Sequence, residues 1–156
     1  VEMLPVVQVG AAGLQLLLAL LVTLPFMLWR GGLHWAVLLL PLYLLPLLLY
    51  VLALGWLLGA LSVYLRDIGH LAPSFSSLLL FLTPIFYPAS MVPASLRWMV
   101  DLNPLAWAAE AARSVLLNGT AAPWQGWGVH LVVSCILAIM GWAFFQRVKP
   151  GFADVL

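Results

Sequence analysis

Four long apolar runs, separated by short polar breaks, dominate the pattern of this sequence. They cover residues 4–29, 35–65, 71–87 and 127–145, and no Asp, Glu, Lys or Arg interrupts any of them. A helix needs about 20 apolar residues to cross the hydrocarbon core of a bilayer. The pattern therefore predicts an all-α polytopic membrane helix bundle with about four transmembrane helices.

The third run passes into a stretch that cannot be one continuous helix. Between Thr83 and Pro104 there are four prolines, each of which lacks an N–H and clashes with the preceding turn: Pro84, Pro88, Pro93 and Pro104. Irregular backbone at membrane depth is tolerated where protein or a water-filled cavity satisfies its polar groups. We therefore expect residues 88–125 to form an extramembrane or re-entrant region at one membrane face.

Local signals place two short helices in this region. One is predicted from Ala94 to Leu102 and the other from Leu105 to Leu117, with Asn103 as N-cap and Pro104 at the first helical position. Glu110 and Arg113 lie three residues apart on one face of the second helix and are expected to pair. Four tryptophans accompany the region, as at a headgroup layer: Trp98, Trp107, Trp124 and Trp127.

Composition excludes most soluble classes of protein. Hydrophobic residues make up 65% of the chain and charged residues 7%, whereas an ordinary soluble domain carries roughly 25% charged residues. The net charge of +1 gives no indication of nucleic-acid binding. Cys135, the single cysteine, lies in an apolar run and is expected to pack as a small buried hydrophobe. Gly55 and Gly59 form a GxxxG pattern, which marks either a helix contact or two tolerated glycines.

No catalytic motif is visible in the sequence. It contains no Walker A phosphate loop and no His-Glu metal motif, and no catalytic or metal-ligating residue is assigned. A transporter coupled to protons or ions usually keeps an ionisable residue at mid-membrane, and the predicted spans carry no charge there. If this protein moves a substrate, we expect the energy to come from elsewhere. A membrane-embedded enzyme would have to use Asp101 with Glu110, or His70 with Asp67.

A series of short motifs, each weak alone, resembles one family in order and spacing. The motifs are Arg66-Asp67-Ile68, Thr83-Pro84-Ile85-Phe86-Tyr87-Pro88, Val92-Pro93, Leu96-Arg97-Trp98, Asn103-Pro104-Leu105, Arg113, Leu116-Leu117-Asn118-Gly119, Trp124 and Gly151-Phe152-Ala153-Asp154. From about Leu4 to the C-terminus, the chain resembles the permease subunit of type 2 ABC exporters of the polysaccharide and polyol-phosphate group. These proteins export O-antigen, capsular polysaccharide or teichoic acid across the bacterial inner membrane.

The resemblance implies a larger assembly. Such permeases have six spans, so we expect residues 1–156 to be the C-terminal part of the transmembrane domain of an N-terminally truncated permease. Two permeases would pair as a homodimer among membrane lipids and pass a lipid-linked glycan outward. Two separate ABC ATPase subunits would bind ATP and Mg²⁺, so this chain is expected to be a transport subunit with no ATPase site or cofactor of its own.

Orientation rests on the end of the last span and on the resemblance, because the basic residues assigned to the two sides are equal in number. Arg147 and Lys149 follow it directly, and a basic pair in this position is typical of a cytoplasmic end. We therefore expect a multi-pass protein of the bacterial inner membrane with a cytoplasmic C-terminus. Counting back over four spans places the Arg66-Asp67 break on the cytoplasmic side and residues 88–125 on the outer side, where the resemblance implies short re-entrant helices at the periplasmic mouth.

Two sets of candidate functional residues follow from the resemblance. Aromatic side chains that line a channel would stack on sugar rings, and the candidates are Tyr43, Trp56, Phe86, Tyr87 and Trp107. The alternative for each is a place facing lipid or inside the helix packing. Arg66 and Asp67 are candidates for the cytoplasmic interface with the ATPase, the alternative being a neutralised pair at the membrane surface.

Two other functions stay open on the sequence. One is a type 2 ABC permease for a drug or another small molecule, which differs from the glycan group by degree. The other is a membrane-embedded glycan or lipid transferase, which no sequence motif supports.

Overall fold

The computed structural model describes residues 3–30, 34–65, 67–85, 87 and 91–154. Every regular element within them is helical, and three segments are long and apolar enough to cross a membrane. They are α1 (Leu4–Arg30), η1 with α2 (Trp35–Leu39 and Leu40–Tyr64), and α6 (Trp124–Val148), which is followed by η4 (Lys149–Asp154). The chain is thus an all-α polytopic membrane bundle, as predicted.

The third apolar run forms a shorter helix than the others. α3 (Asp67–Leu82) has 16 residues. It begins four residues before the start of the predicted run of 71–87 and ends five residues before the end of that run. The early end has a local cause, because the residue before a proline is driven out of the helical region and Pro84 follows Thr83. The backbone turns there, with the Ile85 amide donating to the Thr83 carbonyl at 2.7 Å.

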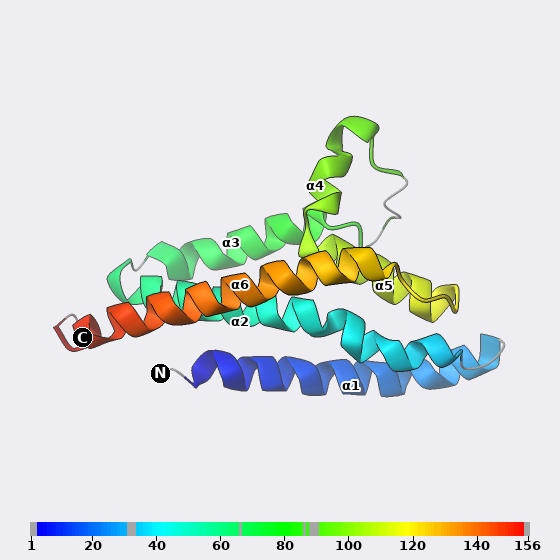
Figure 1. Cartoon of the computed structure of the whole chain (residues 1–156), viewed down its shortest axis with the longest axis horizontal. Helices are drawn as coiled ribbons and strands as arrows, with labels where there is room; N and C mark the ends of the chain where they lie inside the picture. Colours follow the sequence, from blue (N-terminus) through cyan, green and yellow to red (C-terminus); the bar gives the residue numbers. More distant parts are fainter. Residues whose placement is uncertain (1–2, 31–33, 66, 86, 88–90, 155–156) are drawn as a thin grey trace.

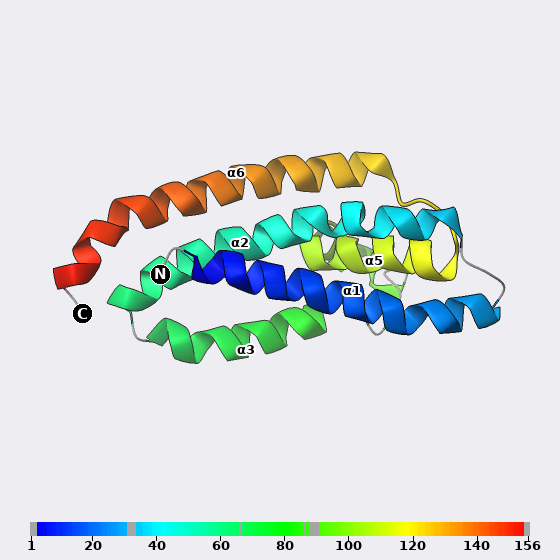
Figure 2. The same ribbon diagram turned by 90° about the horizontal axis from the view of Figure 1, so that it is seen from below.

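α2 is the centre of the bundle and packs against α1, α3, α5 (Pro104–Leu117) and α6. Both termini lie at one end of the bundle, together with the connection from α2 to α3 (Figure 1). The α1–α2 and α5–α6 connections lie at the opposite end (Figures 1 and 2). α3 and α6 flank the α1–α2 pair on opposite sides in Figure 2.

Small side chains allow α6 to lie close to α2. The buried positions of α6 recur every three or four residues and form one stripe: His130, Ser134, Ala138, Gly141 and Phe145. A Cβ at Gly141 would lie 2.7 Å from the carbonyl oxygen of Ala53, so the two backbones touch at this point. Close packing of small residues is a principal source of helix association in membranes, and this stripe accounts for the α2–α6 pair.

Two sequence-based expectations change in the light of this packing. Cys135 is exposed rather than buried, because it neighbours Ser134 and one residue turns a helix by about 100° away from the buried stripe. In the GxxxG pattern, a Cβ at Gly55 would lie 2.9 Å from Cβ of Pro5, whereas a Cβ at Gly59 would meet nothing within 4 Å. Gly55 therefore marks a contact between α1 and α2, and Gly59 does not.

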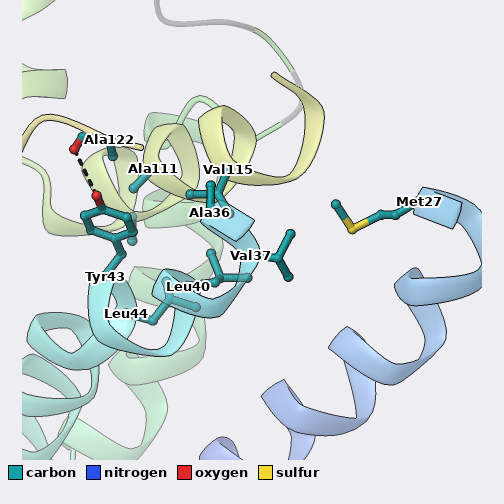
Figure 3. Close-up of a cluster of buried hydrophobic side chains, with 10 residues drawn as sticks. Met27, Ala36, Val37, Leu40, Tyr43, Leu44, Ala111, Val115 and Ala122 are labelled. Carbon is teal, nitrogen blue, oxygen red and sulfur yellow. Dashed lines mark hydrogen bonds between the residues drawn. The ribbon is translucent and has the colours of Figure 1, made fainter. Parts of the chain in front are cut away.

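A second packed region joins α1, the start of α2 and α5. Its core comprises Met27, Ala36, Val37, Leu40, Tyr43, Leu44, Ala108, Ala111, Val115 and Ala122. Figure 3 shows Tyr43 pointing from α2 toward Ala122 in the α5–α6 connection, while Met27 faces this cluster from α1. This core fixes α5 alongside the first half of α2.

Candidate functional site

The junction between α3 and α5 is held by a pair of polar side chains. The buried Thr83 hydroxyl donates to the carbonyl of Leu79 at 2.7 Å and accepts from Nδ2 of Asn103 at 3.0 Å. The other side-chain atom of Asn103, Oδ1, accepts from the Leu105 amide at 2.9 Å, which confirms the predicted N-cap of α5. The Asn103 side chain therefore caps α5 and also joins α5 to the end of α3 by a hydrogen bond.

Arg113, in the middle of α5, makes a second set of hydrogen bonds to the segment after α3. Its guanidinium donates to the carbonyls of Pro84 and Ile85 at 3.3 and 3.1 Å, and to the Glu110 carboxylate at 2.5 Å. The predicted Glu110–Arg113 pair is confirmed. The two carbonyls belong to the turn after α3, where Pro84 leaves backbone acceptors outside any helix. Arg113 thus satisfies backbone that the proline-rich sequence exposes.

Between the end of α3 and Asn103, the chain leaves the bundle, and we call residues 91–102 the α4 excursion. η3 (Ala94–Leu96) and α4 (Arg97–Asp101) occupy the stretch for which a helix over 94–102 was predicted, and α4 projects sideways from the bundle (Figure 1). α5 then runs along α2 toward the α1–α2 connection (Figure 2). Gly119 follows the end of α5 and has a φ of 66°. The ring of His34 packs against it, and a Cβ at Gly119 would lie only 2.5 Å from that ring.

Aromatic rings gather where α2, α5 and α6 meet. Tyr43 lies 6.1 Å from Trp107 and 5.2 Å from Trp124 between ring centroids. Trp107 lies 5.3 Å from His130, and Trp124 lies 5.7 Å from Trp127. Three of the four tryptophans grouped by the sequence therefore meet in space, whereas Trp98 is exposed on α4.

Polar atoms of two of these rings donate hydrogen bonds to backbone carbonyls of other segments. The Tyr43 hydroxyl donates to the carbonyl of Ala122 at 3.0 Å, and Nε1 of Trp127 donates to the carbonyl of Leu42 at 2.8 Å. The Tyr43 phenol is fully buried, and a buried phenol normally finds such a partner. The bonds tie the α5–α6 connection and the first turn of α6 to α2.

The structure separates the predicted channel-lining aromatics into different places. Tyr43 and Trp107 share the ring cluster, with Tyr43 fully buried. Trp56 lies thirteen residues further along α2, about 20 Å away at about 1.5 Å rise per residue, and contacts Trp142 at 5.0 Å. The Tyr87 hydroxyl donates to the carbonyl of Phe81 at 3.3 Å. Phe86 lies outside the described residues, and a lining role for all five stays a prediction.

The predicted cytoplasmic pair is described for one member only. Asp67 is exposed in the first turn of α3, at the end of the bundle where both termini lie. Arg66 lies outside the described residues. Contact of this pair with an ATPase stays a prediction.

A cavity of about 500 Å³ opens between α4, α5 and the start of α6. Its polar and aromatic lining is contributed by Asp101, Trp107, Glu110, Ser114, Gln125 and His130. Sequence reasoning considered Asp101 with Glu110 as the pair that an enzyme would use and Trp107 as a channel-lining aromatic, and it missed the other three. The available signal was the short connection after Gly119, which brings the first turns of α6 back onto α5.

Known proteins resemble this chain in sequence. The ABC-2 type transporter family matches residues 6–117. Two O-antigen export system permease proteins RfbA from Klebsiella pneumoniae are 29% and 28% identical over 96 residues, which is 62% of this chain and 37% of each relative. An RfbA from Myxococcus xanthus, also an O-antigen export system permease protein, is 26% identical over 139 residues, 85% of this chain and 54% of the relative. The chain thus spans between about a third and about half of these relatives' length.

Proposed function

This chain belongs to the ABC-2 type transporter family, and from that premise we propose that it is part of a permease that exports lipid-linked polysaccharide. The substrate would be a glycan of the O-antigen, capsule or teichoic-acid type, moved across the bacterial inner membrane by energy from ATP. The observation that carries this proposal is the similarity to three permeases named for O-antigen export. It also favours a glycan over a drug or another small molecule.

The proposed assembly divides the work between subunits. Two permease copies form the membrane pathway, and two ABC ATPase subunits bind ATP and Mg²⁺. In this arrangement the present chain supplies no catalytic group and holds no cofactor. What supports the division is membership of the ABC-2 type transporter family, whose membrane subunits are transport components.

We place the end of the bundle that holds both termini in the cytoplasm. Arg147 lies in the last turn of α6 and Lys149 follows it, so basic side chains gather at this end. Positive residues next to a span favour the cytoplasmic side. Asp67 lies at the same end, and the proposal therefore puts the Arg66-Asp67 break within reach of the ATPase. With this orientation, α5 and the aromatic cluster lie in the outer half of the membrane.

Deletion of the gene for the full-length permease tests this function in the cell. The expected result is loss of the glycan from the cell surface, with lipid-linked glycan accumulating inside, measured by surface labelling and by extraction of the lipid-linked pool. The matched control keeps the permease and inactivates the phosphate-binding lysine of the partner ATPase, and it should reproduce both effects. Unchanged surface glycan together with a new sensitivity to small molecules would favour the drug-permease alternative.

A further inference from the structure

We propose that the cavity between α4, α5 and α6 is a binding subsite for one uncharged sugar residue of the exported glycan. The inference rests on the proposed function and adds a place and a chemistry for substrate recognition. The site lies in the half of the bundle away from the two termini, next to the ring cluster of Tyr43 and Trp107.

The size of the cavity suits a small polar ligand. Its volume of about 500 Å³ falls within the range of ~300–1,000 Å³ typical of small-molecule pockets. Three elements form the walls, and hydrogen bonds tie α5 and the connection before α6 to the rest of the bundle. Asn103 joins α5 to the end of α3, and the Tyr43–Ala122 hydrogen bond joins the α5–α6 connection to α2.

The polar lining offers both hydrogen-bond donors and acceptors. Asp101 and Glu110 contribute carboxylate oxygens, Gln125 contributes an amide that donates and accepts, and Ser114 contributes a hydroxyl that does both. Each hydroxyl of a sugar also donates and accepts. Carboxylate and amide groups can engage two neighbouring hydroxyls at once, so this combination of groups matches a polyol.

Trp107 provides a flat apolar surface beside these polar groups. Its ring is braced by Tyr43 on one side and by His130, at 5.3 Å between centroids, on another. Gly126 allows this placement, because a Cβ there would collide with Nε1 of Trp107. A pyranose presents C–H groups on one face and hydroxyls at its rim. The side-by-side arrangement of an indole and polar groups therefore fits such a ring.

Charge argues against an anionic ligand in this cavity. Of the described residues that line it, the charged ones are Asp101 and Glu110, and both are acidic. The nearby Arg113 directs its guanidinium to Glu110 and to the carbonyls of Pro84 and Ile85. A lipid phosphate would meet carboxylates with no lining cation to neutralise it, which makes binding unfavourable.

The lining also differs from that of a site for quaternary ammonium groups. Quaternary ammonium groups are recognised by cages of several aromatic faces, whereas the described residues that line this cavity contribute one indole and one imidazole. Donors from Gln125 and Ser114 would have no partner on such a ligand. An uncharged polyol uses the whole set of groups.

Binding to the purified chain in lipid nanodiscs tests the subsite. The probes are the methyl α-pyranosides of glucose, galactose and mannose, with choline and inorganic phosphate as charged comparators, followed by saturation-transfer-difference NMR. Gln125 and Asp101 are exposed at the rim, so Gln125→Glu, Gln125→Ala and Asp101→Ala should fold normally. Each should weaken binding of the preferred glycoside about threefold to tenfold, the effect of one lost hydrogen bond. Asn118→Ala, at an exposed position outside the cavity, is the matched control and should bind as wild type.

Two results would overturn the subsite. One is choline or phosphate binding in preference to every glycoside, and the other is glycoside binding that none of the three rim variants weakens. Far-ultraviolet circular dichroism of each variant, compared with Asn118→Ala, verifies that lost binding is not lost folding. Glycan export by the full-length permease is measured separately in cells. If wild type exports no glycan, the proposed function fails and the subsite falls with it; if it exports glycan and the rim variants bind normally, the subsite alone fails.

Discussion

Asn103 and Thr83, twenty residues apart in the chain, are joined by a hydrogen bond of 3.0 Å between Nδ2 and Oγ1. Thr83 follows the last turn of α3, and Asn103 is the N-cap of α5. The bond therefore closes the excursion that carries α4 and sets where α5 begins. Because α5 forms one wall of the cavity and supplies Trp107, this contact controls the geometry of the proposed site.

Replacing Asn103 separates its two roles. Asn103→Ala removes the cap and the bond to Thr83 and should lower the free energy of unfolding by about 2 kcal/mol, about 1 from each. Asn103→Ser keeps a good cap but is too short to reach Thr83, so the loss should be about 1 kcal/mol. Denaturant unfolding in mild detergent, followed by tryptophan fluorescence, measures both. Equal losses for Ala and Ser would show that the Thr83 bond contributes all of the effect.

The guanidinium of Arg113 should matter more for its carbonyl contacts than for its ion pair. The Arg113 and Glu110 side chains are 25% and 37% exposed, and a pair at such a site contributes at most about 1 kcal/mol. Hydrogen bonds from a charged donor to backbone carbonyls are stronger, at about 1.5–3 kcal/mol each. Arg113→Ala should therefore loosen the α4 excursion more than Glu110→Gln does.

Hydrogen–deuterium exchange of the amides in residues 91–102 measures that loosening. We expect clearly faster exchange in Arg113→Ala and a small change in Glu110→Gln, while the amides of α6 stay protected in both. If Glu110→Gln accelerates exchange as much as Arg113→Ala, the ion pair is the important contact and the account of Arg113 is wrong.

Gly141 and Gly128 both lie on α6 and serve as test position and control. A Cβ at Gly141 would lie 2.7 Å from the Ala53 carbonyl oxygen, whereas a Cβ at Gly128 would meet nothing within 4 Å. Gly141→Ala should force α2 and α6 apart and cost about 1–3 kcal/mol. Gly128→Ala should be neutral or slightly stabilising, because alanine is the better helix former by up to about 1 kcal/mol. Thermal unfolding in detergent checks both; a stable Gly141→Ala protein would argue against the observed α2–α6 contact.

Tyr43→Phe isolates the hydrogen bond at the centre of the ring cluster. The substitution keeps the contacts with Trp107 and Trp124 but leaves the buried Ala122 carbonyl without its donor, which should cost about 1–2 kcal/mol. Tyr64→Phe is the control, because the Tyr64 hydroxyl bonds to the Val148 carbonyl at an exposed site, at 3.3 Å. Chemical unfolding should show a loss below about 0.5 kcal/mol for the control. Equal losses would mean that burial of the Tyr43 bond has no special effect.

Local features of the fold were predictable from the sequence because they depend on neighbouring residues. The N-cap at Asn103, the helix that follows it and the pairing of Glu110 with Arg113 all rest on spacings of two to four residues. The four apolar runs predicted about four spans; three of them form helices long enough to cross a bilayer, and the third run forms the 16-residue α3.

The remaining contacts depend on packing between distant segments. Nothing in the order of residues says that Asn103 reaches Thr83, or that Arg113 reaches the carbonyls after α3. Gly141 shows a missed signal, because the stripe of small residues at Ser134, Ala138 and Gly141 has helical spacing and marks a contact face, yet its partner Ala53 emerges only in the fold. The cavity could not be predicted for the same reason: its lining comes from α4, α5 and α6 together.

Export of glycan by the reconstituted transporter tests the central claim most directly. Vesicles would contain the full-length permease and its partner ATPase with the nucleotide-binding side outward, together with a lipid-linked glycan that an external lectin can bind. The account predicts that ATP makes the glycan inaccessible to the lectin, and that a non-hydrolysable ATP analogue does not. If the glycan stays accessible while ATP drives uptake of a small-molecule dye, the protein is not a glycan exporter and the proposed function is wrong.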